Sequence, residues 1–338
     1  MSAGVLVVME TKGAGERREG EAADWHRISM EALAAGQTLA AGLGIACSAA
    51  VLGQSVVIEP LAAELAEKKL ETVWAVGDDL LSVYTADGWI TALEQLTAQA
   101  APKFVVFPHT YQVRDYAPAL ATRLGEVLIG DVTAIQIADA QSEPVFIRQW
   151  MQGKLNASYR HRKQDGVCLI SVQAGSFRSD AVQSGQGEVR VFAPRLTADK
   201  IRTVPSEPVR EVAQTVDLSA AAVIVGVGRG IGEQENLKLV EDLAQALGAE
   251  LAASRPICDA GWLPMERQVG SSGQTIAPKL YLAVGISGAI QHLVGMKGAK
   301  TVIAINKDAD APIFEVADIG VVGDLFELVP ALTKAIRG

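Results

Sequence analysis

Residues Leu280–His292 read LYLAVGISGAIQH. The apolar run Leu280–Val284 predicts a short buried strand, and the glycine turn Gly285–Gly288 separates it from a predicted helix over Ala289–Met296. Short apolar strands that alternate with helices are typical of parallel sheets covered by helices. The stretch therefore predicts an α/β fold, with a glycine turn at the carboxyl end of one strand.

Four further apolar runs in the same part of the chain end in polar residues or a glycine loop. Carboxyl ends of parallel strands meet at one edge of a sheet, and ligands bind in the crevice at that edge. The pattern therefore predicts a ligand site built by several strands. Ala222–Val225 is followed by Arg229 in a glycine loop, and Leu251–Ala253 is followed by Ser254 and Arg255. Val302–Ile305 is followed by Asn306, and Ile319–Val322 is followed by Asp324 after one glycine.

The glycine turns indicate what kind of ligand this site holds. Ser287 and Gly288 precede a predicted helix, whose free backbone N–H groups and positive dipole end suit a pyrophosphate. Gly288 would let the backbone approach that group, and His292 lies on the same helix face. The loop around Arg229 is not the dinucleotide fingerprint, because the third glycine position falls on Ile231. A nucleotide held in another way is expected.

The segment Arg255–Pro278 shows no clear periodicity, and so long a loop in a compact domain is usually functional. Its centre combines small hydrogen-bonding side chains with flexible glycine, which suits wrapping a heteroaromatic ring. The residues concerned are Gln268, Val269, Gly270, Ser271, Ser272 and Gly273.

The first half of the chain reads as repeated strand–helix units, which predict a parallel sheet. From Val132 to Phe192 one extended segment follows another, and an antiparallel addition to the sheet is expected there. The proline-containing stretch Pro194–Pro208 has the composition of a linker. We therefore expect an N-terminal parallel or mixed-sheet domain over residues 1–200, and a C-terminal doubly wound parallel-sheet domain over residues 209–338.

Charge and cysteine content argue against several classes of protein. The 338-residue chain has a formal net charge of −9, which argues against nucleic acid or an anionic membrane as partner. Cys47, Cys168 and Cys258 form no CxxC pair, so neither a disulfide framework nor a metal site is expected. No apolar run reaches the roughly 20 residues of a membrane helix, and no signal-peptide pattern is found. We expect no membrane insertion and a cytoplasmic location.

Several stretches of the second half together resemble the alpha subunit of electron-transfer flavoproteins. The resemblance is dense over residues 220–330, whereas the first domain resembles the family only in its layout. The stretches that carry it are Ser254–Arg255 with Asp259–Trp262, Gln268–Gly270, Ala277–His292, Ala304–Asp308, Ala311–Phe314 and Asp324–Phe326.

The resemblance implies an electron carrier rather than an enzyme, without catalytic residues of its own. It implies FAD in the C-terminal domain and a heterodimer with a beta subunit, which the first domain contacts. The redox partners would be flavin dehydrogenases and a membrane quinone oxidoreductase, and some members of the family bifurcate electrons with a second FAD. The residues that match FAD contacts are Arg229, Ser254, Arg255, Gln268, Val269, Gly270, Ser271, Ser272, Ser287, Gly288, Ala289, Ile290, Gln291, His292, Asn306, Asp324 and Leu325.

Three of these residues have a more specific implied role. The resemblance places Arg255 beside the flavin ring and His292 at its N1 and C2-carbonyl edge. Ser272 stands where many relatives carry threonine, so a hydroxyl near flavin N5 is retained. A cation and a hydrogen-bond donor at these positions would stabilise negative charge on the reduced ring.

Two other classes of function fit a doubly wound domain. One is an NAD-dependent, dehydrogenase-like nucleotide-binding protein, against which the missing fingerprint counts. The other is a nucleotide-sensing or scaffolding module without redox activity. The visible spectrum of the purified protein separates these classes, because only the carrier shows bands of oxidised flavin.

Overall fold

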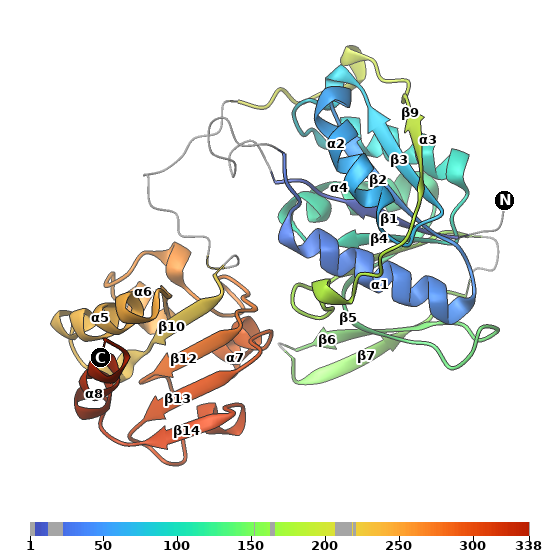
Figure 1. Cartoon of the computed structure of the whole chain (residues 1–338). Helices are drawn as coiled ribbons and strands as arrows, with labels where there is room; N and C mark the ends of the chain where they lie inside the picture. The colour runs from blue at the N-terminus through green and yellow to red at the C-terminus, as the bar shows by residue number, and fades with distance from the viewer. Residues whose placement is uncertain are drawn as a thin grey trace. The chain divides into compact units, whose positions relative to one another are not determined.

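The structure is a computed structural model that describes residues 4–12, 23–151, 153–162, 166–206, 218 and 221–337. It consists of two compact units, each built on its own sheet (Figure 1). The last residues of the predicted linker, 207 and 208, and the predicted start of the second domain at 209 lie outside the described residues. The predicted domain boundaries therefore stay a prediction.

The first unit contains a nine-stranded sheet in the order β7-β6-β5-β8-β4-β1-β2-β3-β9. The strands are β1 (Val5–Met9), β2 (Cys47–Gly53), β3 (Thr72–Gly77), β4 (Phe104–Pro108), β5 (Val127–Gln136), β6 (Val145–Trp150), β7 (Leu155–Tyr159), β8 (Cys168–Val172) and β9 (Glu188–Phe192). The mixed sheet confirms the predicted fold class of this half of the chain.

The predicted antiparallel addition is correct for only part of the segment Val132–Phe192. Strand β6 pairs with β5 in antiparallel orientation. In contrast, β8 lies between β4 and β5 and is parallel to both, and β9 pairs in parallel with β3 at the far edge. All five residues of β8 are buried, as expected for a strand in the interior of a sheet. Consecutive extended segments in a sequence do not reveal that order.

Helices cover both faces of this sheet: α1 (Arg27–Leu43) and α2 (Ser55–Ala66) on one, α3 (Ala86–Ala100) and α4 (Tyr111–Leu124) on the other. The sequence of β1 shows why both faces must be covered. Val5, Val7 and Met9 belong to the core under α1 and α2, while Leu6 and Val8 belong to the core under α3 and α4. Alternate side chains of a strand point to opposite faces, so a strand without polar residues needs two covers.

The second unit contains five parallel strands in the order β11-β10-β12-β13-β14. They are β10 (Val223–Val227), β11 (Glu250–Ala253), β12 (Leu280–Val284), β13 (Val302–Asn306) and β14 (Ile319–Val322). The helices are α5 (Leu237–Leu247), α6 (Arg255–Asp259), α7 (Ile290–Met296) and α8 (Leu325–Arg337). The all-parallel sheet confirms the predicted doubly wound domain.

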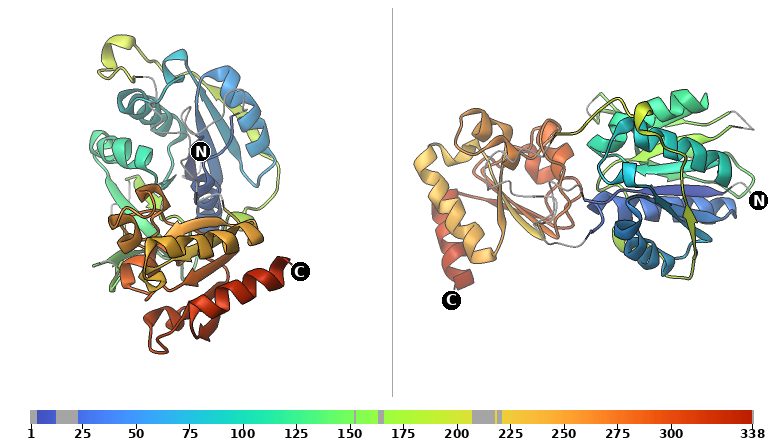
Figure 2. Two further views of the ribbon diagram at one scale, coloured as in Figure 1. Left: turned by 90° about the vertical axis from the view of Figure 1, so that its left-hand side faces the viewer. Right: turned by 90° about the horizontal axis from the view of Figure 1, so that it is seen from above.

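The strand order of the second unit locates its crevice. The chain runs from β10 outward to β11, and then returns to place β12 on the opposite side of β10. The switch point at which ligands bind in such sheets therefore lies at the carboxyl ends of β10 and β12. Helices α5 and α8 pack side by side on one face of the sheet, as both views in Figure 2 show.

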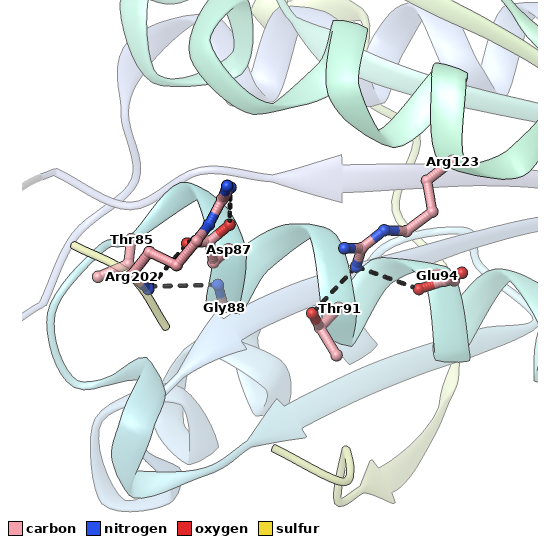
Figure 3. Close-up of polar contacts among 7 residues, drawn as sticks. All are labelled: Thr85, Asp87, Gly88, Thr91, Glu94, Arg123 and Arg202. Carbon is pink, nitrogen blue, oxygen red and sulfur yellow. Dashed lines mark hydrogen bonds and ion pairs between the residues drawn. The ribbon is translucent and has the colours of Figure 1, made fainter. Parts of the chain in front are cut away.

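The first part of the predicted linker is bound to the first unit. The Arg195 N–H donates to the Gln95 side-chain oxygen at 2.8 Å. The Arg202 guanidinium donates two hydrogen bonds to Asp87, at 2.7 and 3.1 Å, and its backbone N–H donates a third at 3.0 Å (Figure 3). These hydrogen bonds lower the pKa of Asp87. Residues 195–202 therefore form a strap, held at both ends on α3.

The cysteines of both units are buried and unpaired. Burial raises the pKa of Cys47 and of Cys168 to about 12, so neither thiol ionises at neutral pH. Within the described ranges, no helix has the length and apolar character needed to cross a membrane. Among the same residues, no cluster of three or more side chains could hold a metal ion.

Asp87→Ala should release the end of the strap, because it removes the carboxylate that accepts all three hydrogen bonds of Arg202. Trypsin should then cleave after Arg202 several-fold faster than in the wild-type protein, measured by mass spectrometry over time. Glu94→Ala is the matched control: it removes the ion pair of Glu94 with Arg123 on α4 and leaves the strap in place (Figure 3). Equal cleavage rates in wild type and Asp87→Ala would show that Asp87 does not hold the strap.

Candidate functional site: the carboxyl edge of the second sheet

At the switch point, the loops after β10 and β12 lie directly against each other. The Gly228 N–H donates to the Val284 carbonyl at 2.9 Å, and the Gly230 N–H donates to the Gly285 carbonyl at 3.0 Å. A Cβ on Gly228 would lie 2.6 Å from the carbonyl carbon of Gly285, and one on Gly230 would lie 2.7 Å from its Cα. Glycines at the ends of parallel strands commonly let the backbone approach a ligand. In the structure Gly228 and Gly230 let two loops approach each other.

The turn between β12 and α7 is fixed in a similar way. Gly288 has φ of +86°, and a Cβ there would lie 2.6 Å from the Cα of Ile313. The Ile313 N–H donates to the Ser287 carbonyl at 3.1 Å, and the Asn306 side chain donates to the Ile286 carbonyl at 2.9 Å. Gly288 therefore accommodates the backbone of residues 312–313, rather than a ligand. Ser287 and Ala289 remain exposed at the edge of the sheet.

The segment Arg255–Pro278 is not one continuous loop. It contains the short helix α6 and a 3₁₀ turn at Met265–Arg267. The predicted ring-binding residues form a compact loop, Gln268–Gln274, in which the Gln274 N–H donates to the Gln268 carbonyl at 2.7 Å. Helical periodicity is not detectable in a helix as short as α6, so the sequence could not distinguish it from a loop.

The Gln268–Gln274 loop lies against α7 and the end of β11. The Val269 N–H donates to the Ala253 carbonyl at 2.9 Å, and the Ser271 N–H donates to the Gln291 carbonyl at 2.7 Å. A Cβ on Gly295 of α7 would lie 2.5 Å from the Cα of Gly270. The structure thus brings the predicted loop residues together with the predicted helix residues, although they are separated by about twenty positions in the sequence.

His292 is buried, with 5% of its surface exposed. Its Nε2 lies 2.8 Å from the hydroxyl oxygen of Tyr281 on β12. Burial lowers the pKa of His292 to about 4, although the backbone of Val269 acts in the opposite direction. The imidazole is therefore neutral at physiological pH, and it can act as a hydrogen-bond donor but not as a cation.

The remaining predicted residues lie along the same edge. The Arg229 side chain donates to the Pro256 carbonyl at 3.4 Å, and the Ser254 N–H donates to the Val227 carbonyl at 2.9 Å. The Arg255 side chain is 64% exposed and pairs with Asp259 one turn along α6, at 3.3 Å. No hydrogen bond or ion pair between Arg255 and the Gln268–Gln274 loop or His292 is found among the described contacts.

Asp324 and Leu325 begin α8 at the end of β14. The Asp324 carboxylate accepts the Phe326 N–H at 2.8 Å and thereby caps the helix. Leu325 is buried, and its side chain reaches the turn after β12, where a Cβ on Gly285 would lie 3.1 Å from it. Asp324 itself lies two strands away from the switch point.

Tyr281 and Gly226 are site residues that the sequence analysis missed. Gly226 of β10 leaves room for the tyrosine ring, since a Cβ there would lie 2.5 Å from the Cζ of Tyr281 and nearer still to its hydroxyl oxygen. The signal was available: a glycine inside a strand often marks a close approach, and a tyrosine in an aliphatic strand needs a partner for its hydroxyl.

The unsatisfied polar atoms test whether these residues fit a nucleotide cofactor. In the described part of the second unit, two buried side-chain atoms lack a hydrogen-bond partner of normal geometry: Gln268 Oε1 and His292 Nδ1. The backbone of Val269 is near enough to the imidazole to raise its pKa, but it makes no hydrogen bond of normal geometry with Nδ1. Both unpartnered atoms belong to predicted cofactor residues. Buried polar atoms are rarely left without a partner, so their position favours a ligand with hydrogen-bonding groups. The fold and this edge define a protein that holds a nucleotide cofactor at the carboxyl ends of a parallel sheet.

Comparison with known proteins identifies the family. Residues 217–297 match the family model of the electron transfer flavoprotein FAD-binding domain, and residues 17–196 match that of the electron transfer flavoprotein domain. The electron transfer flavoprotein subunit alpha of Bacillus subtilis is 38% identical over 327 residues, which cover 96% of each chain. That of Thermoanaerobacterium thermosaccharolyticum is 36% identical and covers 92% of this chain and 93% of its own. Protein FixB of Azotobacter vinelandii is 35% identical, covering 92% and 87%. The chain belongs to the electron transfer flavoprotein alpha-subunit family.

Gly228→Ala should force the two loops of the switch point apart. Gly228 has φ of −114°, so alanine meets no backbone strain there and the effect is steric. We expect a loss of about 1–3 kcal/mol of stability from overpacking, together with a lower FAD content. Urea unfolding and the flavin absorbance of the purified protein measure the two effects.

The control for this variant is Gly130→Ala in the first unit, where the Cβ would meet the Ser171 hydroxyl at an ordinary 3.6 Å. It should keep normal stability and FAD content. If Gly228→Ala were as stable and as yellow as this control, the contact between the two loops would not organise the site.

Proposed function

We propose that the protein is an electron carrier, not an enzyme, which holds FAD at the carboxyl edge of the second sheet and works as a heterodimer with a beta subunit. It would accept electrons from flavin dehydrogenases and deliver them to a membrane quinone oxidoreductase. The observation that carries the proposal is the contact of the Gln268–Gln274 loop with α7 beside the end of β11, where Gln268 and His292 each leave a buried polar atom unpartnered.

The residues proposed to hold FAD differ in what they can offer. Val269, Gly270 and Gly288 are buried and packed against neighbouring backbone, so they would shape the site, whereas the exposed Ser271, Ser272, Ser287 and Gln291 would contribute side chains. The further proposed contacts are Arg229, Ser254, Arg255, Gln268, Ala289, Ile290, His292, Asn306, Asp324 and Leu325. FAD supplies the redox chemistry, and the protein binds it, orients it and sets the electrostatic environment of its ring.

The site contains no arrangement that favours hydrolysis. Cys258 is buried, and burial raises its pKa to about 11. A serine–histidine pair does occur in the first unit: His109 Nδ1 lies 2.8 Å from the Ser171 hydroxyl oxygen. Ser171 is only 3% exposed and accepts the Asp131 N–H at 3.2 Å. Asp131 lies in β5 with φ of +62°, where the register with β8 shifts, so this pair supports a strained bulge of the strand rather than a nucleophile.

The loop after β10 also argues against a nicotinamide enzyme. In the dinucleotide fingerprint the glycine loop leads directly into the helix that holds the pyrophosphate. Here α5 starts only at Leu237, after two 3₁₀ turns. The glycines contact the neighbouring loop, so they leave no space between the two loops for a pyrophosphate.

Co-expression tests the proposed function. The chain expressed alone should be poor in flavin, whereas co-expression with a beta subunit should yield a 1:1 complex with the visible bands of oxidised FAD. Size-exclusion chromatography with absorbance detection measures both. One FAD per heterodimer indicates an ordinary carrier, and two indicate a bifurcating one. A co-purified complex without flavin would overturn the proposal.

Arg255→Ala tests the proposed position of this cation beside the ring. A charge at close range contributes about 1–4 kcal/mol at effective dielectric constants of 80 to 20. The first one-electron potential of the bound FAD should therefore fall by roughly 40–170 mV. Asp259→Asn, which removes the anion paired with Arg255, should shift the potential in the opposite direction. Spectroelectrochemical titration at equal FAD content measures these shifts.

The matched control is Arg337→Ala, in the last turn of α8. Helix α8 starts at the carboxyl edge, and its thirteen residues carry Arg337 roughly 20 Å away from it. This variant should leave the potential unchanged. His292→Ala should lower the potential less than Arg255→Ala, because a neutral donor interacts more weakly than a charge. An unchanged potential in Arg255→Ala would mean that this arginine only pairs with Asp259.

A further inference from the structure

The hydrogen bond between Tyr281 and His292 connects the core of the sheet to the cofactor site. Tyr281 is fully buried in β12 and belongs to the same hydrophobic cluster as Ile224 and Met296. His292 is the third residue of α7 and is also buried. Their 2.8 Å contact joins β12 to α7, and the room for it depends on the missing side chain of Gly226.

The two possible directions of this hydrogen bond are not equivalent. If the imidazole donated from Nε2, the hydroxyl hydrogen of Tyr281 and the Nδ1 lone pair of His292 would both lack a partner. If the hydroxyl donates to Nε2, only the Nδ1–H group lacks one. A buried polar group without a partner destabilises the fold, so the second arrangement, which leaves fewer such groups, is favoured.

We propose that Tyr281 is a positioning residue: its hydroxyl donates to Nε2 of His292 and keeps the imidazole proton on Nδ1, so that the ring offers a fixed N–H donor at the FAD site. This inference rests on the proposed function for the identity of the ligand. The Tyr281 hydroxyl thus selects the tautomer of His292, and the donor role of His292 depends on that tautomer.

The burial of both groups supports this arrangement. Burial raises the pKa of the Tyr281 hydroxyl far above its usual range, so the proton stays on the oxygen. Burial also keeps His292 neutral, since its pKa is lowered to about 4. Only a neutral imidazole has one nitrogen that accepts and one that donates. The pair therefore holds one proton arrangement over the whole physiological pH range.

The tautomer can be measured directly in the full chain, in complex with its beta subunit, by ¹⁵N–¹H correlation spectroscopy with labelled histidine. The chain has four histidines, so the His292 signals can be assigned by replacing His26, His109 and His161 one at a time. We expect Nδ1 with the shift of a protonated nitrogen and Nε2 with that of an unprotonated one. A protonated Nε2 with an unprotonated Nδ1 in the wild-type complex would overturn the inference.

Tyr281→Phe removes only the hydroxyl. The His292 signals should then shift to those of a mixture of tautomers. The dissociation constant of FAD should rise about tenfold, because a tenfold change corresponds to the loss of one hydrogen bond's contribution. Tyr116→Phe is the matched control, because it removes the hydroxyl of another fully buried tyrosine, in the first unit. It should change neither the His292 signals nor FAD affinity.

A double-mutant cycle shows whether Tyr281 acts through His292. In a His292→Leu background, Tyr281→Phe should change FAD affinity less than twofold, whereas independent effects would multiply. A full tenfold effect in that background would contradict the inference. If the wild-type complex bound no FAD, the proposed function would fail, but the tautomer of His292 would still be readable. The two failures are therefore distinguishable.

Discussion

The second unit depends on the contact between two backbone loops at its switch point. Gly228 and Gly230 lie so close to Gly285 that no side chain fits between them. Two hydrogen bonds between the loops, from the Gly228 and Gly230 N–H groups, fix their relative position. Two further approaches of the same kind follow, Gly288 against Ile313 and Gly270 against Gly295. Each fixes one segment of the site relative to the previous one, so rigid backbone rather than long side chains positions the edge at which the cofactor is proposed to bind.

This arrangement leaves few polar atoms for ligand binding, and it leaves them in defined positions. Where backbone groups bond to one another, as Ser271 does to Gln291, they cannot also be the main contacts of a ligand. The atoms that remain are Gln268 Oε1 and His292 Nδ1 in the interior, and hydroxyl and amide groups on the exposed rim. A neutral, buried histidine held by a tyrosine suits a carrier, since its protonation state does not change over the pH range in which electrons are exchanged.

The first unit has the same layered architecture but a different switch point, at the ends of β1 and β4. There the Thr110 hydroxyl donates to the Glu10 carboxylate across the gap between the two strands. A carboxylate at this edge opposes an anionic phosphate, whereas the second unit has glycine backbone at the corresponding place. The difference is consistent with the match of the second unit, and not of the first, to the FAD-binding domain of the family.

The sequence by itself determined the fold class, the family and which segments approach the cofactor edge. Apolar strands such as Leu280–Val284, each followed by polar or glycine residues, carry this information locally, because strand ends in a parallel sheet converge whatever the details of packing. The sequence did not determine the strand order in the first unit, where β8 and β9 pair with strands that are distant from them in the sequence. Side-chain alternation shows that a strand is buried, but not which strand is beside it.

Tertiary structure alone decided what the glycines contact and which residue is the partner of His292. A glycine at position 228 and another at position 288 each indicate a close approach. The group that approaches comes from a residue distant in the sequence: Gly285 approaches Gly228, and Ile313 approaches Gly288. Likewise, the pairing of Tyr281 with His292 arises from the register of β10 and β12, which places Gly226 where the tyrosine needs space. Such long-range packing leaves no periodic pattern in the sequence, because the residues in contact belong to different elements.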